Sequence, residues 1–129
     1  ALPICTPGDS TDPGTEAVMI CGPNTDAGGP VSGTYSLAHD AQSLQGALAD
    51  VIGTATTVIC PGNIQSPGPW RRVADPATPR GTLFCGIGGD GRPLIAWTLD
   101  AARFLAVVES PRLDGAGLND LYAWWASHS

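Results

Sequence analysis

The sequence predicts an α+β fold in which an antiparallel sheet packs against two helices. Three observations predict it: an amphipathic pattern over 36–52, a series of short apolar runs separated by turn residues, and a second helical pattern over 116–127. We expect a meander of about four to five strands, with both helices on the same face. The 129 residues suit one domain, which we divide into a Pro/Gly-rich arm at 1–33 and an α+β domain at 34–129.

The N-terminal arm is dominated by Pro, Gly, Asp and Thr, which are typical of turns. Only Ala17–Cys21 is apolar enough for a strand. Because Cys5 and Cys21 both lie in the arm, we expect a disulfide to pin it as an extended segment.

The first helix is predicted over 36–52 because apolar residues recur there at intervals of three and four, as on one face of a helix. These residues are Leu37, Ala41, Leu44, Leu48 and Val51 or Ile52. Ser36 is a suitable N-cap, and Gly53 is a suitable residue just beyond the last turn.

Short runs of β-branched and apolar residues between the two helices predict the strands of the meander. The first three runs are Thr54–Cys60, Trp70–Ala74 and Thr82–Ile87. Gly88–Pro93 has the composition of a hairpin turn. Two further strands lie within 93–110 and pair across a tight turn.

The most apolar passage of the chain, Pro93–Ser110, is interpreted as the central hairpin of the sheet. Asp100, Arg103 and Glu109 interrupt it, so it does not cross a bilayer as a helix. Its apolar side chains alternate onto both faces of the predicted strands, and both faces therefore need a cover. We expect the two helices to cover one face, and the N-terminal arm or a partner to cover the other.

The C-terminal helix is predicted over 116–127, with Asp114 or Asn119 as its cap. Four residues share its apolar face: Leu118, Leu121, Tyr122 and Trp125. Trp124 lies off that face.

The four cysteines predict two disulfides, because an even number in a small chain rich in Pro and Gly is typical of a disulfide-stabilised domain. They are Cys5, Cys21, Cys60 and Cys85. A zinc site would need close pairs such as C-x-x-C, which the sequence lacks. Three pairings are possible, of which we favour Cys5–Cys21 and Cys60–Cys85.

Disulfides indicate an oxidising compartment, so we expect an extracytoplasmic protein that is secreted or lies in the cell wall or a periplasm-like space. The sequence opens without a signal peptide, as expected of a mature secreted chain or of an ectodomain. No stretch reaches the roughly 18 apolar residues of a spanning helix, so we expect no membrane insertion by this segment.

The charge of the chain disfavours two classes of partner. The net charge is −6 and every basic residue is Arg. Binding to nucleic acid or to an anionic membrane surface needs a cationic face, so we expect neither.

Neither catalytic residues, cofactor-binding residues nor metal ligands are predicted. His39 and Asp40 are adjacent on the polar side of the predicted helix, where sequence neighbours do not face each other. The segment Gly86–Gly91 lacks the Lys of a phosphate-binding loop. A small secreted hydrolase is a further hypothesis, ranked third after the two described below. It would require His39 to meet a Ser and an Asp in a cleft.

Trp70, Arg71, Arg72 and Trp124 form the candidate binding patch. Exposed aromatic side chains beside Arg are typical of recognition surfaces. The alternative is that these tryptophans pack against the sheet or cover its edge.

Several short motifs occur in order along the chain: "CGP…GGP", "CPG", "GTLFCG", "IAWT" and a terminal "LYAWW". With the amphipathic helix and a lone Trp between them, they resemble a family of small extracytoplasmic domains from actinobacteria, notably mycobacteria. The resemblance covers residues 20–127. Some members look like secreted or lipid-anchored proteins, and others look like the C-terminal sensor domains of receptor-type Ser/Thr kinases.

The resemblance implies a disulfide-bonded α+β domain outside the cytoplasm that recognises a ligand or protein partner. Our leading hypothesis is accordingly a non-enzymatic sensor-type domain. In a receptor kinase, dimerisation of the ectodomain would bring the cytoplasmic kinase domains together, so a homodimer is one implied assembly. The alternative is a free-standing secreted or cell-wall-associated protein. The resemblance transfers no catalytic residue and does not identify the ligand.

Overall fold

The computed structural model describes residues 5–8, 14–23, 29–72 and 75–128, and within these ranges it contains eight strands and two α-helices. The strands are β1 (Cys5–Pro7), β2 (Thr15–Cys21), β3 (Ser32–Ala38), β4 (Thr56–Thr57), β5 (Gly68–Arg72), β6 (Asp75–Ile87), β7 (Pro93–Leu99) and β8 (Phe104–Glu109). The helices are α1 (Ala41–Thr54) and α2 (Gly115–His128), and a 3₁₀ helix, η1 (Asp100–Ala102), joins β7 to β8. The predicted α+β class and both predicted disulfides are confirmed.

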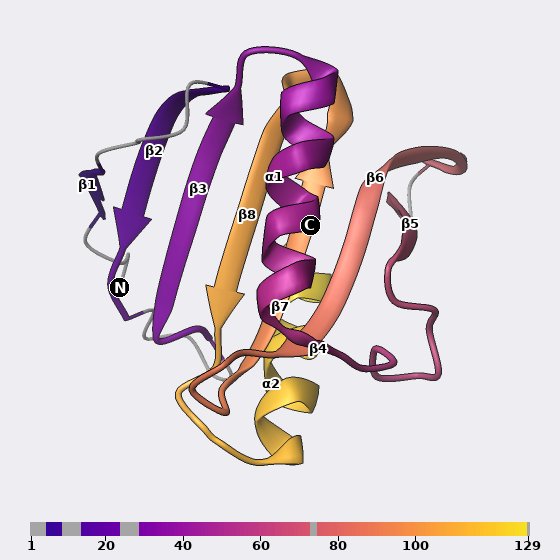
Figure 1. Cartoon of the computed structure of the whole chain (residues 1–129). Coiled ribbons are helices and arrows are strands. Elements are labelled where there is room, and N and C mark those ends of the chain that lie inside the picture. The colour runs from indigo at the N-terminus through magenta and orange to yellow at the C-terminus, as the bar shows by residue number, and fades with distance from the viewer. Residues whose placement is uncertain (1–4, 9–13, 24–28, 73–74, 129) are drawn as a thin grey trace.

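All eight strands belong to one antiparallel sheet (Figure 1). The strand order is β1-β2-β3-β8-β7-β6-β4, and β5 also pairs with β6. The sheet is larger than the predicted meander because β1 and β2 come from the N-terminal arm and pair with β3. The chosen boundary between residues 33 and 34 falls inside β3.

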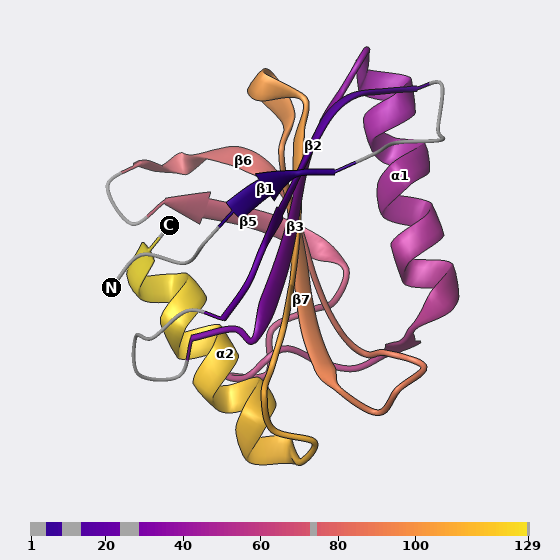
Figure 2. The ribbon, with the colours of Figure 1, turned by 90° about the vertical axis from the view of Figure 1, so that its left-hand side faces the viewer.

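The two helices lie on opposite faces of the sheet, as the edge-on view in Figure 2 shows. The prediction that both cover the same face is therefore wrong. The core beneath α1, here called the α1 core, consists of Ala38, Leu44, Leu48, Phe84, Leu94, Ala96 and Leu105. The core beneath α2, here called the α2 core, consists of Cys60, Trp70, Leu83, Cys85, Ile95, Val108, Leu121, Trp124 and Trp125.

The predicted hairpin at Pro93–Ser110 is confirmed as β7 and β8, joined by η1. Its successive side chains alternate between the two cores: Leu94 and Ala96 lie beneath α1, and Ile95 lies beneath α2. Each face of this hairpin is thus covered by a helix of the same chain. The expectation that the arm or a partner must cover its second face is wrong.

Helix α1 begins five residues later than predicted, because Ser36 belongs to β3, where it pairs with Leu105 of β8. Asp40 is the N-cap, and its carboxylate accepts a hydrogen bond from the Ser43 backbone N–H at 2.7 Å. Pairing on both sides of β3 satisfies its backbone groups, and this outweighs the helical pattern of the sequence.

The strands around the second disulfide also differ from the predicted bounds. Of the predicted run 54–60 only Thr56–Thr57 forms a strand, and Cys60 makes an isolated bridge with Ile64. The run predicted at 70–74 is β5, which begins at Gly68, while 73–74 lie outside the described residues. Strand β6 begins at Asp75 because β5 provides a partner for its first half.

The C-terminal helix is confirmed, and Asp114 rather than Asn119 caps it: the Asp114 carboxylate accepts from the Gly117 N–H at 3.1 Å. Trp124, placed off the apolar face by the sequence pattern, is buried. Cys60 and Trp70 belong to the same α2 core as Trp124. No helix in the described part of the chain is both long and apolar enough to cross a membrane.

Candidate functional site

The four residues of the predicted binding patch do not form an exposed aromatic surface. Trp70 and Trp124 are only 6% and 9% exposed and belong to the α2 core. Arg71 is exposed on β5, and Arg72 ends the same strand with a side chain outside the described set. The alternative interpretation, in which the tryptophans pack against the sheet, therefore applies.

Trp70 connects β5 to β7. Its indole Nε1–H donates to the backbone carbonyl of Thr98 at 2.8 Å, and its ring packs edge-on against Trp125 with centroids 5.6 Å apart. Gly81, which pairs with Trp70, allows this approach, because a Cβ at Gly81 would lie 2.0 Å from the same Thr98 oxygen. This buried hydrogen bond gives Trp70 a structural role.

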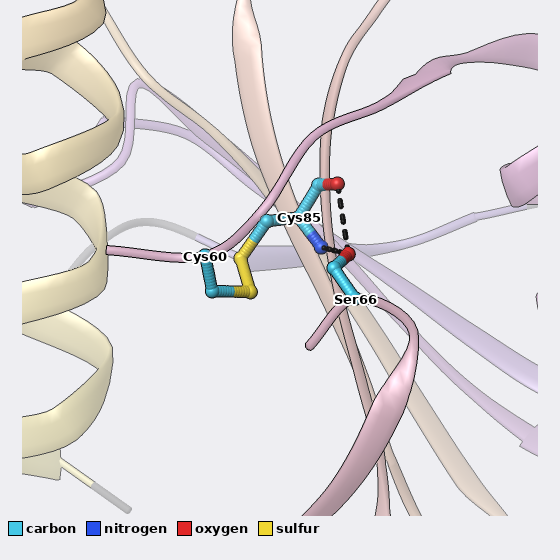
Figure 3. Close-up of a disulfide and its surroundings, with 3 residues drawn as sticks. All are labelled: Cys60, Ser66 and Cys85. Carbon is cyan, nitrogen blue, oxygen red and sulfur yellow. Dashed lines mark hydrogen bonds between the residues drawn. A yellow bond between two sulfur atoms is a disulfide. The ribbon is translucent and has the colours of Figure 1, made fainter. Parts of the chain in front are cut away.

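The Cys60–Cys85 disulfide attaches the loop before β5 to the sheet. Both cysteines are buried in the α2 core. The Ser66 hydroxyl lies beside the disulfide; it accepts from the Cys85 N–H at 2.8 Å and donates to the Cys85 carbonyl at 3.1 Å (Figure 3). These contacts hold the loop against β6.

An apolar hollow of about 270 Å³ lies over β2, β3 and β8. Its lining consists of Ala17, Val18, Met19, Tyr35, Ser36, Leu37 and Phe104. Tyr35 pairs with Ala106 and packs against the α2 core, so the hollow opens on the face that carries α2. Helix α2 packs mainly against β7 and leaves this part of the face open.

Aromatic side chains form part of the hollow. The rings of Tyr35 and Phe104 are stacked, with centroids 6.1 Å apart and an interplanar angle of 19°. Tyr35 lies across Gly33, since a Cβ there would come within 2.8 Å of the Tyr35 hydroxyl. Burial raises the pKa of the Tyr35 phenol above 10.0, which keeps the phenol neutral. Met19 and Leu37 are each 40% exposed, so the hollow is accessible to solvent.

This hollow was not predicted from the sequence. Its lining comes from three strands that are far apart in the chain, and residues 36–38 of β3 were assigned to the helix. The available signal was the two-residue spacing of Tyr35 and Leu37, which is the period of a strand.

His39 and Asp40 precede α1, so their predicted position on its polar side is wrong. The His39 side chain is exposed, and its backbone carbonyl accepts a hydrogen bond from the Arg103 guanidinium. The hydrogen bond from the Ser43 N–H is the main cause that lowers the pKa of the Asp40 carboxyl below 3.8. The Asp40 carboxylate therefore caps the N-terminus of α1.

In the ranges described above, no group of three or more His, Cys, Asp or Glu side chains could hold a metal ion.

The chain matches no protein family model, no curated protein and no solved structure. The hollow, the two disulfides and the acidic composition therefore carry the functional inference.

Proposed function

We propose that this chain is a non-enzymatic, extracytoplasmic domain of the sensor type that binds a small apolar ligand in the hollow over β2, β3 and β8. The observation that carries the proposal is the hollow itself, because it is apolar and open to solvent. Concave apolar surfaces of this kind are the usual sites of small-molecule binding.

The size and the charge of the site favour a small uncharged ligand. The volume of about 270 Å³ is close to the lower end of the range of about 300–1,000 Å³ for such sites. The polar members of the lining are Tyr35 and Ser36, and the net charge of −6 disfavours an anionic ligand. Burial of apolar ligand surface would supply about 25 cal/mol per Å².

The two disulfides support an oxidising, extracytoplasmic location. The resemblance to sensor domains supports attachment to a receptor-type Ser/Thr kinase, in which the ligand would act by changing ectodomain dimerisation. A free secreted or cell-wall-associated protein is the alternative setting. The gene upstream of Ala1 separates the two: a kinase domain followed by an apolar span supports the receptor, and a cleavable signal peptide supports secretion.

Binding can be tested with the neutral, environment-sensitive fluorophore prodan. We expect a saturable blue shift in its emission with the wild-type chain and loss of that shift in Leu37→Asp. Leu113→Asp is the matched control, because Leu113 is also an exposed leucine, at 65%, but lies outside the hollow. Absence of saturable binding, or equal loss in both variants, would overturn the proposal.

A further inference from the structure

We propose that the Cys5–Cys21 disulfide is a thiol–disulfide exchange site, which a dithiol reductant opens while Cys60–Cys85 remains closed. Reduction would release β1 from the edge of the sheet. The two disulfides differ in their access to solvent, in the elements that they hold and in what their opening would disturb.

Access differs most clearly. Cys5 is exposed on β1, and its partner Cys21 is 5% exposed. Cys60 and Cys85 are 1% and 0% exposed and lie in the α2 core. Because exchange requires a thiolate to reach a disulfide sulfur, an exposed disulfide reacts before a buried one.

Among the described residues, β1 is held by pairing with β2 in addition to the disulfide. It is three residues long, all of them exposed, and it pairs with β2 at the edge of the sheet. Beyond the strand, the Gly8 N–H donates to the Val18 carbonyl at 2.9 Å. A short edge strand that buries little apolar surface contributes little stability on its own, so loss of the covalent link should favour release of β1.

The exchange balances with a dithiol as the co-reactant. One thiolate of the dithiol attacks the Sγ of Cys5, and the Cys5–Cys21 bond breaks. Cys21 leaves as a thiolate and takes a proton. The second thiol of the reductant then attacks the mixed disulfide and releases Cys5, so the protein gains two electrons and the dithiol leaves as a disulfide.

Release of β1 would alter the hollow. Strand β2 supplies Ala17, Val18 and Met19 to the lining, and it would become the edge strand of the sheet. An edge strand that has lost one neighbour fluctuates more, so we expect weaker binding in the reduced state. This consequence rests on the proposed function, whereas the exchange itself does not.

The exchange is tested on the full chain by differential alkylation. The native protein is treated with dithiothreitol, thiols are blocked with iodoacetamide at successive times, and the peptides are measured by mass spectrometry. Cleavage after Glu16 separates Cys5 from Cys21, and cleavage at Arg71 separates Cys60 from Cys85. We expect Cys5 and Cys21 to be alkylated together, at least about tenfold faster than the buried pair.

Equal rates for the two disulfides, or reduction of Cys5–Cys21 only in denaturant, would overturn the exchange site. Hydrogen exchange tests the release of β1: amides of β2 should lose protection on selective reduction, while those of β7 should not. Unchanged protection of β2 would show that β1 stays in place and would overturn that part.

The double variant Cys5→Ser/Cys21→Ser is the matched control. It should show the hydrogen exchange of the reduced wild type and should not respond to dithiothreitol in β2. Should this variant fail to fold, the wild-type alkylation rates still decide the proposal. Prodan titration of the oxidised and reduced chain is read separately, so failure of ligand binding leaves the exchange result intact.

Discussion

The two halves of the sheet differ in how they are covered. Strands β6, β7 and β8, here called the covered half, lie between α1 and α2, and their central residues Phe84, Ile95 and Ala106 are fully buried. Strands β1, β2 and β3, here called the open half, carry the exposed apolar residues Met19 and Leu37.

The same contrast holds for the disulfides. The covered half has the buried Cys60–Cys85 bond, which Ser66 supports by two hydrogen bonds. The open half has Cys5–Cys21, which reaches solvent. Buried apolar side chains are thus concentrated in the covered half, whereas both proposed sites, the hollow and the Cys5–Cys21 disulfide, lie in or beside the open half.

The largest expected effect comes from the covered half. Phe84→Ala should lower the free energy of unfolding by about 3–5 kcal/mol, because it removes a fully buried ring from the α1 core. Leu37→Ala in the open half should cost about 1 kcal/mol or less, since two-fifths of that side chain is already exposed. Urea denaturation with both disulfides intact measures the two values, and equal losses would refute the contrast between the halves.

A smaller loss of stability is expected for a substitution where β5 pairs with the covered half. Trp70→Phe keeps most of the buried ring but leaves the Thr98 carbonyl without its indole donor, which should cost about 1–3 kcal/mol. Trp97→Phe is the control, because Trp97 is only half-buried at the margin of the same core. The same urea denaturation serves here, and a larger loss in the Trp97 variant would contradict the role given to Trp70.

The smallest change in stability is expected at the N-cap of α1, and it should depend on pH. The pKa of the Asp40 carboxyl is lower in the folded state than its ordinary value of 3.8. Its contribution to stability against unfolding is therefore present above the unfolded pKa and is lost as pH falls through the folded pKa. The melting temperature of Asp40→Asn should therefore be below that of the wild type near pH 7, and the two should converge in strong acid. Asp50→Asn, exposed on the same helix, controls for loss of one charge. A constant difference at every pH would exclude the cap as the cause.

Local patterns were sufficient for much of the fold. The alternating apolar residues of 93–110 identified β7 and β8, and the composition of 88–93 identified the turn before them, although Pro93 itself is the first residue of β7. The number and spacing of the cysteines led to both disulfides. These features depend on residues close in sequence or on the chemistry of one residue type.

Residues 36–40 show where local patterns failed. Leu37 continues the helical spacing of Leu44 and Leu48, yet it lies in β3 because β2 and β8 pair with that strand on both sides. The sequence of 36–52 contains no local signal that β2 and β8 will pair with this segment. The hollow could not be predicted for the same reason, because its lining forms only when β2, β3 and β8 are adjacent in the fold.

The α+β class, the central hairpin and two helices with apolar faces followed from the sequence, which also favoured, among three possible pairings, the disulfides that the structure shows. The opposite faces taken by α1 and α2, the burial of Trp70 and Trp124, and the apolar hollow over β2, β3 and β8 became apparent only in the folded chain. The physical reason is that a hydrophobic stripe specifies that an element must be covered, while the partner that covers it is set by contacts between residues distant in the chain.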